Sequence, residues 1–182
     1  MKNKNVAFIT RTAVLLALCV VLQLAIPAEL QMVKGPLVNV VLLVAAMAGG
    51  LSCGLIVAVL NPLLVFLLNA PAAMKLCPQI LFVVMAGNCI LVAVAWLLRK
   101  PLMGIPGLVA AAVAKGVGML LLTSYVILPM FGAKLVAKGV DTAVKASFGI
   151  FQLYTAAIGA VVFFIIWQVL KRVPGLAEEE GK

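Results

Sequence analysis

Histidine is absent from this sequence, and acidic residues are few. Among 182 residues there are five Asp and Glu side chains, and none falls within a long apolar run. Glu29 and Asp141 lie in predicted loops, and the other three, residues 178–180, lie in the C-terminal tail. Proton relays inside membranes use ionisable carboxylates or histidines, and catalytic metals need clusters of the same residues. These absences argue against a proton-driven carrier that works alone and against a metalloenzyme.

Nucleotide-binding and nucleophilic motifs are also missing. No GxxxxGK[ST] loop is present to hold phosphates. Ser52 lies in Leu-Ser-Cys-Gly, which is not the GxSxG turn of a hydrolase, and no base is available to activate it. The four cysteines form no CxxC pair and are expected to be free, small apolar residues: Cys19, Cys53, Cys77 and Cys89. We therefore expect no enzyme, no cofactor and no metal site.

Apolar residues make up most of the sequence. The chain is 66% hydrophobic and 10% charged, with a mean hydropathy of +1.28, whereas soluble domains carry about a quarter charged residues. A membrane-spanning helix needs about 20 mostly apolar residues. We predict an all-α integral membrane protein in which residues 1–182 form one transmembrane domain, with six helices in a compact bundle. The expected spans are 7–27, 36–50, 51–69, 79–98, 105–129 and 147–170.

The second and third spans are the least clearly separated. They meet at Ala48-Gly49-Gly50 with no charged residue to mark a turn, and the second span is short. A single bent helix over this region would change both the number of crossings and the topology.

Lys and Arg side chains predict the orientation, because cytoplasmic loops carry more of them. With both ends inside, the inner side holds eight basic residues: Lys2, Lys4, Arg11, Arg99, Lys100, Lys171, Arg172 and Lys182. The outer side then holds five: Lys34, Lys75, Lys134, Lys138 and Lys145. This asymmetry predicts an N-in, C-in topology. Since the charges flank the membrane and form no stripe, the net charge of +9 does not indicate nucleic-acid binding.

Polar side chains occur in every predicted span, at mid-depth or toward the outer side. Polar groups in lipid are functional candidates, and their shared depth favours a cavity that opens outward and binds a polar small molecule. Alternatively, each amide holds helices together or satisfies backbone, which suits Asn61 because Pro62 frees a carbonyl. The candidate ligand-binding residues are Asn39, Asn61, Asn88, Lys115, Tyr125 and Gln152.

Lys115 is the most unusual of these candidates. It lies about ten residues into the fifth span, roughly 15 Å deep and near the midplane. A lysine at that depth costs about 2.5–3.5 kcal/mol, and no acidic residue in any span can pair with it. Its partner must be a carbonyl, an amide oxygen, water, another subunit or an anionic ligand. Five lysines in the predicted outer loops, against Glu29 and Asp141, also favour an anionic ligand.

Several stretches of the sequence together point to a family. They are Ala13-Val-Leu-Leu-Ala17, Gly35-Pro-Leu-Val-Asn39, Asn61-Pro62-Leu, Met85-Ala-Gly-Asn88, Val113-Ala-Lys115 and Phe151-Gln-Leu-Tyr-Thr-Ala156. With its size, its six expected spans and its basic N-terminal stub, the chain resembles the substrate-binding S components of energy-coupling-factor (ECF) vitamin transporters over most of its length.

The resemblance implies a subunit of the prokaryotic plasma membrane. Such a subunit binds one water-soluble vitamin or related micronutrient from outside, under the loops that join helices 1–2, 3–4 and 5–6. It docks on a membrane scaffold (T) subunit that carries two ATPase subunits, and it topples in the bilayer to release its cargo inside. The AxxxA pair of the first span, Ala13 and Ala17, would form the docking face. Two other classes stay open: a small channel or facilitator, and a structural membrane subunit.

Overall fold

The protein is helical throughout the part of the chain that the structure describes. This computed structural model describes residues 2–27, 30–69, 71–100, 105–139, 141–170 and 172, and these contain no strand. In chain order the elements are α1 (Lys2–Ala25), α2 (Gln31–Asn69), α3 (Ala72–Leu76), α4 (Ile80–Leu98), α5 (Ile105–Leu122), the π-helical η2 (Thr123–Ile127), α6 (Leu128–Ala137), α7 (Asp141–Phe148) and α8 (Ile150–Leu170). The predicted all-α class is confirmed. Glu29, the acidic tail, Lys171 and Lys182 lie outside the described residues.

Five helical stretches of the described chain are long and apolar enough to cross a membrane. They are Lys4–Ala25, Gln31–Asn69, Ile80–Leu98, Ile105–Ala133 and Val144–Leu170. Six spans were expected, and the difference lies in α2. This 39-residue stretch covers both the second and the third predicted spans.

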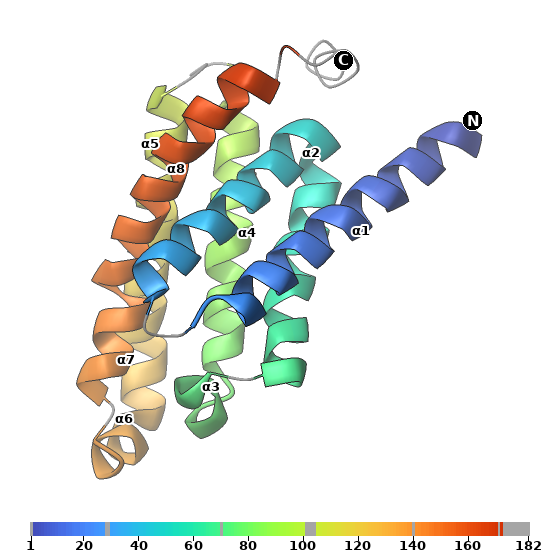
Figure 1. The fold of residues 1–182 in the computed structure, drawn as a ribbon. Coiled ribbons are helices and arrows are strands. Elements are labelled where there is room, and N and C mark those ends of the chain that lie inside the picture. Colours follow the sequence, from blue (N-terminus) through green and yellow to red (C-terminus); the bar gives the residue numbers. More distant parts are fainter. Residues whose placement is uncertain are drawn as a thin grey trace.

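α2 is broken at a single glycine. Gly50 has φ 81° and ψ 172°, which is not helical, and glycine reaches this region without the steric cost that a Cβ adds. In Figure 1 the chain reverses its direction there, so that a first arm (residues 31–49) and a second arm (residues 51–69) meet at one end and diverge toward the other. The helix therefore breaks at the joint that the sequence indicated, and each arm is long enough to pack as a helix of its own.

The two ends of the bundle are built differently (Figure 1). α3, α6 and α7 lie together at one end, called here the short-helix end. The start of α1, the Gly50 break and the end of α8 lie at the opposite end, called here the terminal end. α5 consequently runs toward the short-helix end, whereas α4 and α8 start there.

Two apolar clusters form the interior. α2 packs against α1, α4 and α8, and α5 packs against α4 and α8. The larger cluster lies toward the terminal end and includes Leu42, Leu43, Val57, Leu91 and Phe163. The smaller one joins α3, α6 and α7 to α4 and α5, and it includes Met74, Ile80, Met119, Leu135 and Val144. Polar side chains lie between these clusters.

The fifth predicted span continues further than expected. α5, η2 and α6 follow one another without a break to Ala137, beyond the predicted end at residue 129. Within η2, the Thr123 hydroxyl donates a hydrogen bond to the Phe148 carbonyl, with an oxygen–oxygen distance of 3.3 Å. This contact ties the π-helical segment to the end of α7.

Candidate functional site

A polar layer separates the two apolar clusters. On α5, Lys115 lies between Ala112 of the larger cluster and Met119 of the smaller one. On α4, Asn88 is placed in the same way between Leu91 and Val83. The interior therefore changes from apolar to polar and back again along each helix.

Three asparagines of this layer lie equally far from the ends of their helices. Asn39 and Asn88 each lie eight residues after the first residue of their helix, and Asn61 lies eight residues before the last residue of α2. At 1.5 Å per residue, all three are about 12 Å from the short-helix ends of their helices. This agreement follows from the break at Gly50, because the two arms of α2 run in opposite directions.

Lys115 joins three helices at this depth. Its Nζ atom donates to Oδ1 of Asn39 on α2 at 2.6 Å and to Oδ1 of Asn88 on α4 at 2.8 Å. The three side chains are 3%, 1% and 3% exposed, respectively. Lys115, Asn39 and Asn88 are called here the Lys115 cluster. The amide oxygen, one of the partner types expected for Lys115, is the type that the structure shows.

The charge of this cluster is not balanced by an acid. All five acidic residues of the sequence lie outside α1, α2, α4, α5 and α8, and Asp141 is the first residue of α7. Two amide oxygens direct their partial negative charge at the ammonium, and hydrogen bonds to a charged donor are stronger than neutral ones. They stabilise the cation but leave a net positive charge inside the bundle, where opposite charge is strongly attracted because the dielectric constant is low.

Some hydrogen-bonding groups in the layer have no partner among the described residues. They are Nδ2 of Asn39 and both polar atoms of the Asn61 side chain. Because Nδ2 of the fully buried Asn61 has no partner among the described residues, its amide does not bond to the carbonyl that Pro62 frees, as the structural alternative required. Buried polar atoms are paired in the great majority of cases, and an unpaired buried group costs about 1–3 kcal/mol.

Glycine lets α8 approach the cluster closely. A Cβ added at Gly159 would lie 2.8 Å from Cβ of Asn39 and 2.9 Å from the carbonyl oxygen of Pro36. A Cβ at Gly35 would likewise lie 2.8 Å from Cβ of Thr155. The first arm of α2 and α8 are therefore in backbone-to-side-chain contact beside Asn39, and the position of Asn39 depends on this contact.

Cys19 belongs to the same region and was not among the predicted site residues. Its thiol is fully buried on α1 and lies within electrostatic range of the Lys115 ammonium. All four cysteines are free, as predicted. Hydropathy alone made Cys19 look like an ordinary apolar residue, and its closeness to Lys115 depends on how α1 crosses the bundle.

Two predicted site residues lie away from the cluster. Tyr125 is 76% exposed on the surface of η2. Gln152 is half-buried, and its Nε2 donates to the carbonyl of Ser147 at 3.1 Å. The structure therefore brings together Asn39, Asn88 and Lys115, buries Asn61 in the second arm of α2, and leaves Tyr125 and Gln152 outside the cluster.

α1 is the most peripheral of the long helices. Only 11% of the residues in its most apolar stretch are buried, against 28–44% in the other four candidate spans. Ala13 and Ala17 are exposed on it, together with Val14, Leu18 and Val21. These residues are called here the α1 face. The small size of Ala13 and Ala17 is therefore on the exposed side of α1 and not in the buried core.

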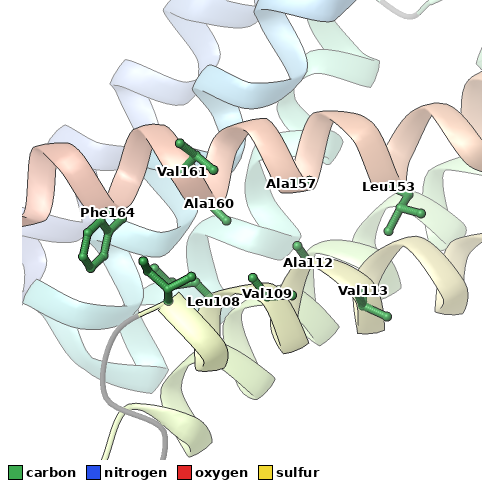
Figure 2. A pocket seen from close by; sticks show the side chains of 10 residues that line it. Leu108, Val109, Ala112, Val113, Leu153, Ala157, Ala160, Val161 and Phe164 are labelled. Atoms are coloured by element: carbon green, nitrogen blue, oxygen red, sulfur yellow. The ribbon is translucent and has the colours of Figure 1, made fainter.

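A separate groove between α5 and α8 has no polar chemistry. Figure 2 shows its side chains, which include Leu108 and Ala112 of α5 and Leu153, Ala160 and Phe164 of α8. It encloses about 190 Å³ and is lined only by apolar residues. Nothing in it could recognise a polar ligand, so the Lys115 cluster is the better candidate site.

Comparison with known proteins agrees with this architecture. The family model for "ECF transporter, substrate-specific component" matches residues 7–170. The chain belongs to this family of ECF transporter substrate-specific components. Among solved structures, the S component of a bacterial ECF transporter is similar, with a TM-score of 0.66 and 20% sequence identity over 94% of this chain and 98% of that chain. No curated protein sequence matches the chain.

Membership of the family sets the general role. The protein is an integral membrane subunit of the prokaryotic plasma membrane that binds a transported substrate, and it is not an enzyme. At 20% identity, the likeness to the solved S component shows that the fold is shared.

Proposed function

We propose that this S component captures a water-soluble vitamin or related micronutrient from outside the cell and delivers it by docking on a scaffold subunit that carries two ATPases. The single observation that carries the proposal is the coexistence of a buried polar cluster inside the bundle and an exposed face of small and apolar residues on α1. The first can hold a ligand, and the second can accept a partner helix.

The chemistry of the chain is consistent with transport that is driven by the ATPases of a partner complex. The sequence has no phosphate-binding loop and no histidine, and its long helices carry no carboxylate that could couple to protons. A subunit of this kind binds its cargo but depends on partners to move it. The exposed Ala13 and Ala17 would let a helix of the scaffold approach α1 closely, because small side chains permit short distances between helix axes.

We further propose six membrane crossings with both ends inside. The reversal at Gly50 lets α2 supply two of the crossings. The basic residues divide accordingly: Lys75, Lys138 and Lys145 are exposed near the short-helix end, whereas Arg99 and Lys100 follow α4 at the terminal end. Under the positive-inside rule the terminal end faces the cytoplasm.

Cysteine labelling tests this topology. A single cysteine at position 75 or 138 should react with a membrane-impermeant maleimide added from outside, and one at position 100 should be protected. The native background is low because Cys19, Cys53 and Cys77 are buried. External labelling at 100 alone would reverse the orientation.

Affinity purification tests the function itself. The tagged chain, extracted in mild detergent, should bring down a large membrane subunit and two ATPases, and mass spectrometry of the same sample should find a small molecule in near-stoichiometric amount. A chain that purifies alone and yet conducts solutes through liposomes would be a channel or facilitator. Recovery in a complex without ATPases would indicate a structural subunit.

A further inference from the structure

We infer that the Lys115 cluster is the part of the ligand site that receives a carboxylate of the transported molecule, with Asn61 available to its uncharged part. The inference rests on the proposed function and adds the chemical class of the ligand. It follows from the hydrogen-bond balance of the cluster, from its charge and from its place in the bundle.

The cluster holds more donors than acceptors. The Lys115 ammonium has three N–H donors, and Asn39 and Asn88 accept two of them through Oδ1. Nδ2 of Asn39 has no acceptor among the described residues. Because this nitrogen belongs to the same amide that binds Lys115, the unpaired donors and the charge lie within one small region. A carboxylate offers two oxygens with about four lone pairs, which is the complement of this group.

The charge of Lys115 favours a carboxylate over a neutral hydrogen-bond acceptor. A water molecule or a ligand hydroxyl could accept a hydrogen bond from Nδ2 of Asn39, but neither would neutralise the ammonium of Lys115. An acidic side chain on a neighbouring helix would do so, and the long helices contain none. Neutral oxygens hold Lys115 in place while leaving its charge available to an anionic group.

Asn61 adds an uncharged polar group to the proposed site. Its side chain is fully buried, and both its oxygen and its nitrogen lack partners among the described residues. It lies on the second arm of α2, eight residues from the end of that arm, as Asn39 and Asn88 lie eight residues from the starts of their helices. A group that both donates and accepts, such as an amide or a hydroxyl, would pair with it.

The charge at the short-helix end also favours an anion. Lys75 on α3, Lys138 at the end of α6 and Lys145 on α7 are exposed at the short-helix end. Positive charge on this face raises the local concentration of anions beside it. From that end the cluster is about 12 Å away along the helices.

Asn39→Asp is the most informative variant, because it places an acid beside Lys115 without changing the side-chain volume. If the cluster serves a carboxylate ligand, the new acid takes the ligand's place: the protein should melt at the same or a higher temperature, and carboxylate binding should weaken at least tenfold. If Lys115 only holds helices together, the same variant should keep its affinity unchanged.

The assay compares carboxylic acids with their neutral counterparts. Thermal melting of the detergent-purified chain would be followed with nicotinate and nicotinamide, biotin and biotinamide, and pantothenate and pantothenol, in chloride-free buffer with added chloride in one arm. At least one acid should raise the melting temperature, its neutral counterpart should not, and chloride alone should not. Lys115→Met should abolish the response. Thr12→Val is the matched control, since it removes a buried hydroxyl on α1 that bonds only to the Phe8 carbonyl, and it should retain the response.

Four results would overturn the inference. They are equal stabilisation by an acid and its neutral counterpart, no stabilisation by any acid, an unchanged response in Asn39→Asp, and a response to chloride that acids do not compete with. The last would assign the cluster to an inorganic anion. If any of these occurs while the chain still purifies with its scaffold and ATPases, the ligand class is wrong and the proposed function stands. If purification also fails, both fall.

Discussion

The Lys115 cluster and the α1 face each differ from what is usual in a membrane protein, one inside the bundle and the other on its surface. The cluster buries a cation and two amides where apolar side chains would pack without cost. The α1 face leaves two alanines, Ala13 and Ala17, on the outside, where larger side chains could cover more of the helix. The cluster therefore has more polar groups than a bundle interior usually holds, and the α1 face has small side chains at two exposed positions.

The comparison shows that each departure calls for a different occupant. A buried charge with unpaired donors calls for an acceptor of opposite charge, which a small ligand can bring. A smooth face in lipid is not driven to associate by hydrophobicity, because lipid is as apolar as the face, and small residues gain from close contact with another helix instead. The two regions therefore suit a ligand and a protein partner, respectively, and changes in one should leave the other working.

The largest effect is expected on the α1 face. Ala17→Trp should reduce energised uptake in reconstituted vesicles to background, because an indole ring would hold the partner helix away from α1. Binding of ligand and melting temperature should stay at wild-type values, since Ala17 is exposed and the ring can point away from the bundle.

Ala133→Trp is the control for this prediction. Ala133 is also exposed, but it lies on α6 at the short-helix end. Uptake should be nearly normal in this variant. Full uptake by Ala13→Trp and Ala17→Trp would remove both residues from the docking role.

A smaller effect is expected within the cluster. Asn88→Leu removes one of the two acceptors of Lys115 and should lower the free energy of unfolding, measured by SDS titration in micelles, by about 1.5–3 kcal/mol, the range for hydrogen bonds to charged groups. Adding Lys115→Met to Asn88→Leu removes the ammonium that had been left with one acceptor. The double variant should therefore be less destabilised than the sum of the two single variants, and strict additivity would show that the 2.8 Å contact contributes nothing.

A further test concerns the contact that places Asn39. Gly159→Ala should destabilise the protein by about 1–3 kcal/mol, the range for overpacking, because the added Cβ would lie 2.8 Å from Cβ of Asn39. It should also weaken ligand binding, since Asn39 must shift. Normal affinity in this variant would show that ligand binding does not depend on the position of Asn39.

The smallest effect belongs to a glycine with free space around it. Gly132 lies in α6 and has no atom within 4 Å of an added Cβ. Gly132→Ala should stabilise the protein by up to about 1 kcal/mol through helix propensity, with unchanged affinity. Destabilisation of the same size as in Gly159→Ala would show that the difference between the two sites is not steric.

Much of the fold could be predicted from the sequence because its signals are local. Long apolar runs predicted the helices, and the glycine pair predicted where α2 breaks. The distances of Asn61, Asn88 and Lys115 along their helices could be counted on the runs, whereas Asn39 was expected near the outer end of a span that starts at residue 36 and lies further in because α2 starts at Gln31. The sequence also limited the partners of Lys115 to a few types, of which the amide oxygen is the one found.

The rest depends on how each helix is rotated about its axis, which sequence counting does not give. Tyr125 has the expected place along its helix, yet its side chain is exposed on the π-helical segment. Cys19 is near Lys115 only because of the path that α1 takes across the bundle. Which asparagine oxygens face the lysine is likewise decided by packing, including the close approach at Gly159.

Native mass spectrometry of affinity-purified variants tests most directly whether the two regions do separate work. Ala17→Trp should appear as the chain with its small molecule and without scaffold or ATPases. Lys115→Met should appear bound to scaffold and ATPases and without the small molecule. If both variants lose the same component, or if Lys115→Met keeps the small molecule at wild-type occupancy, the assignment of ligand to the cluster and partner to the α1 face is contradicted.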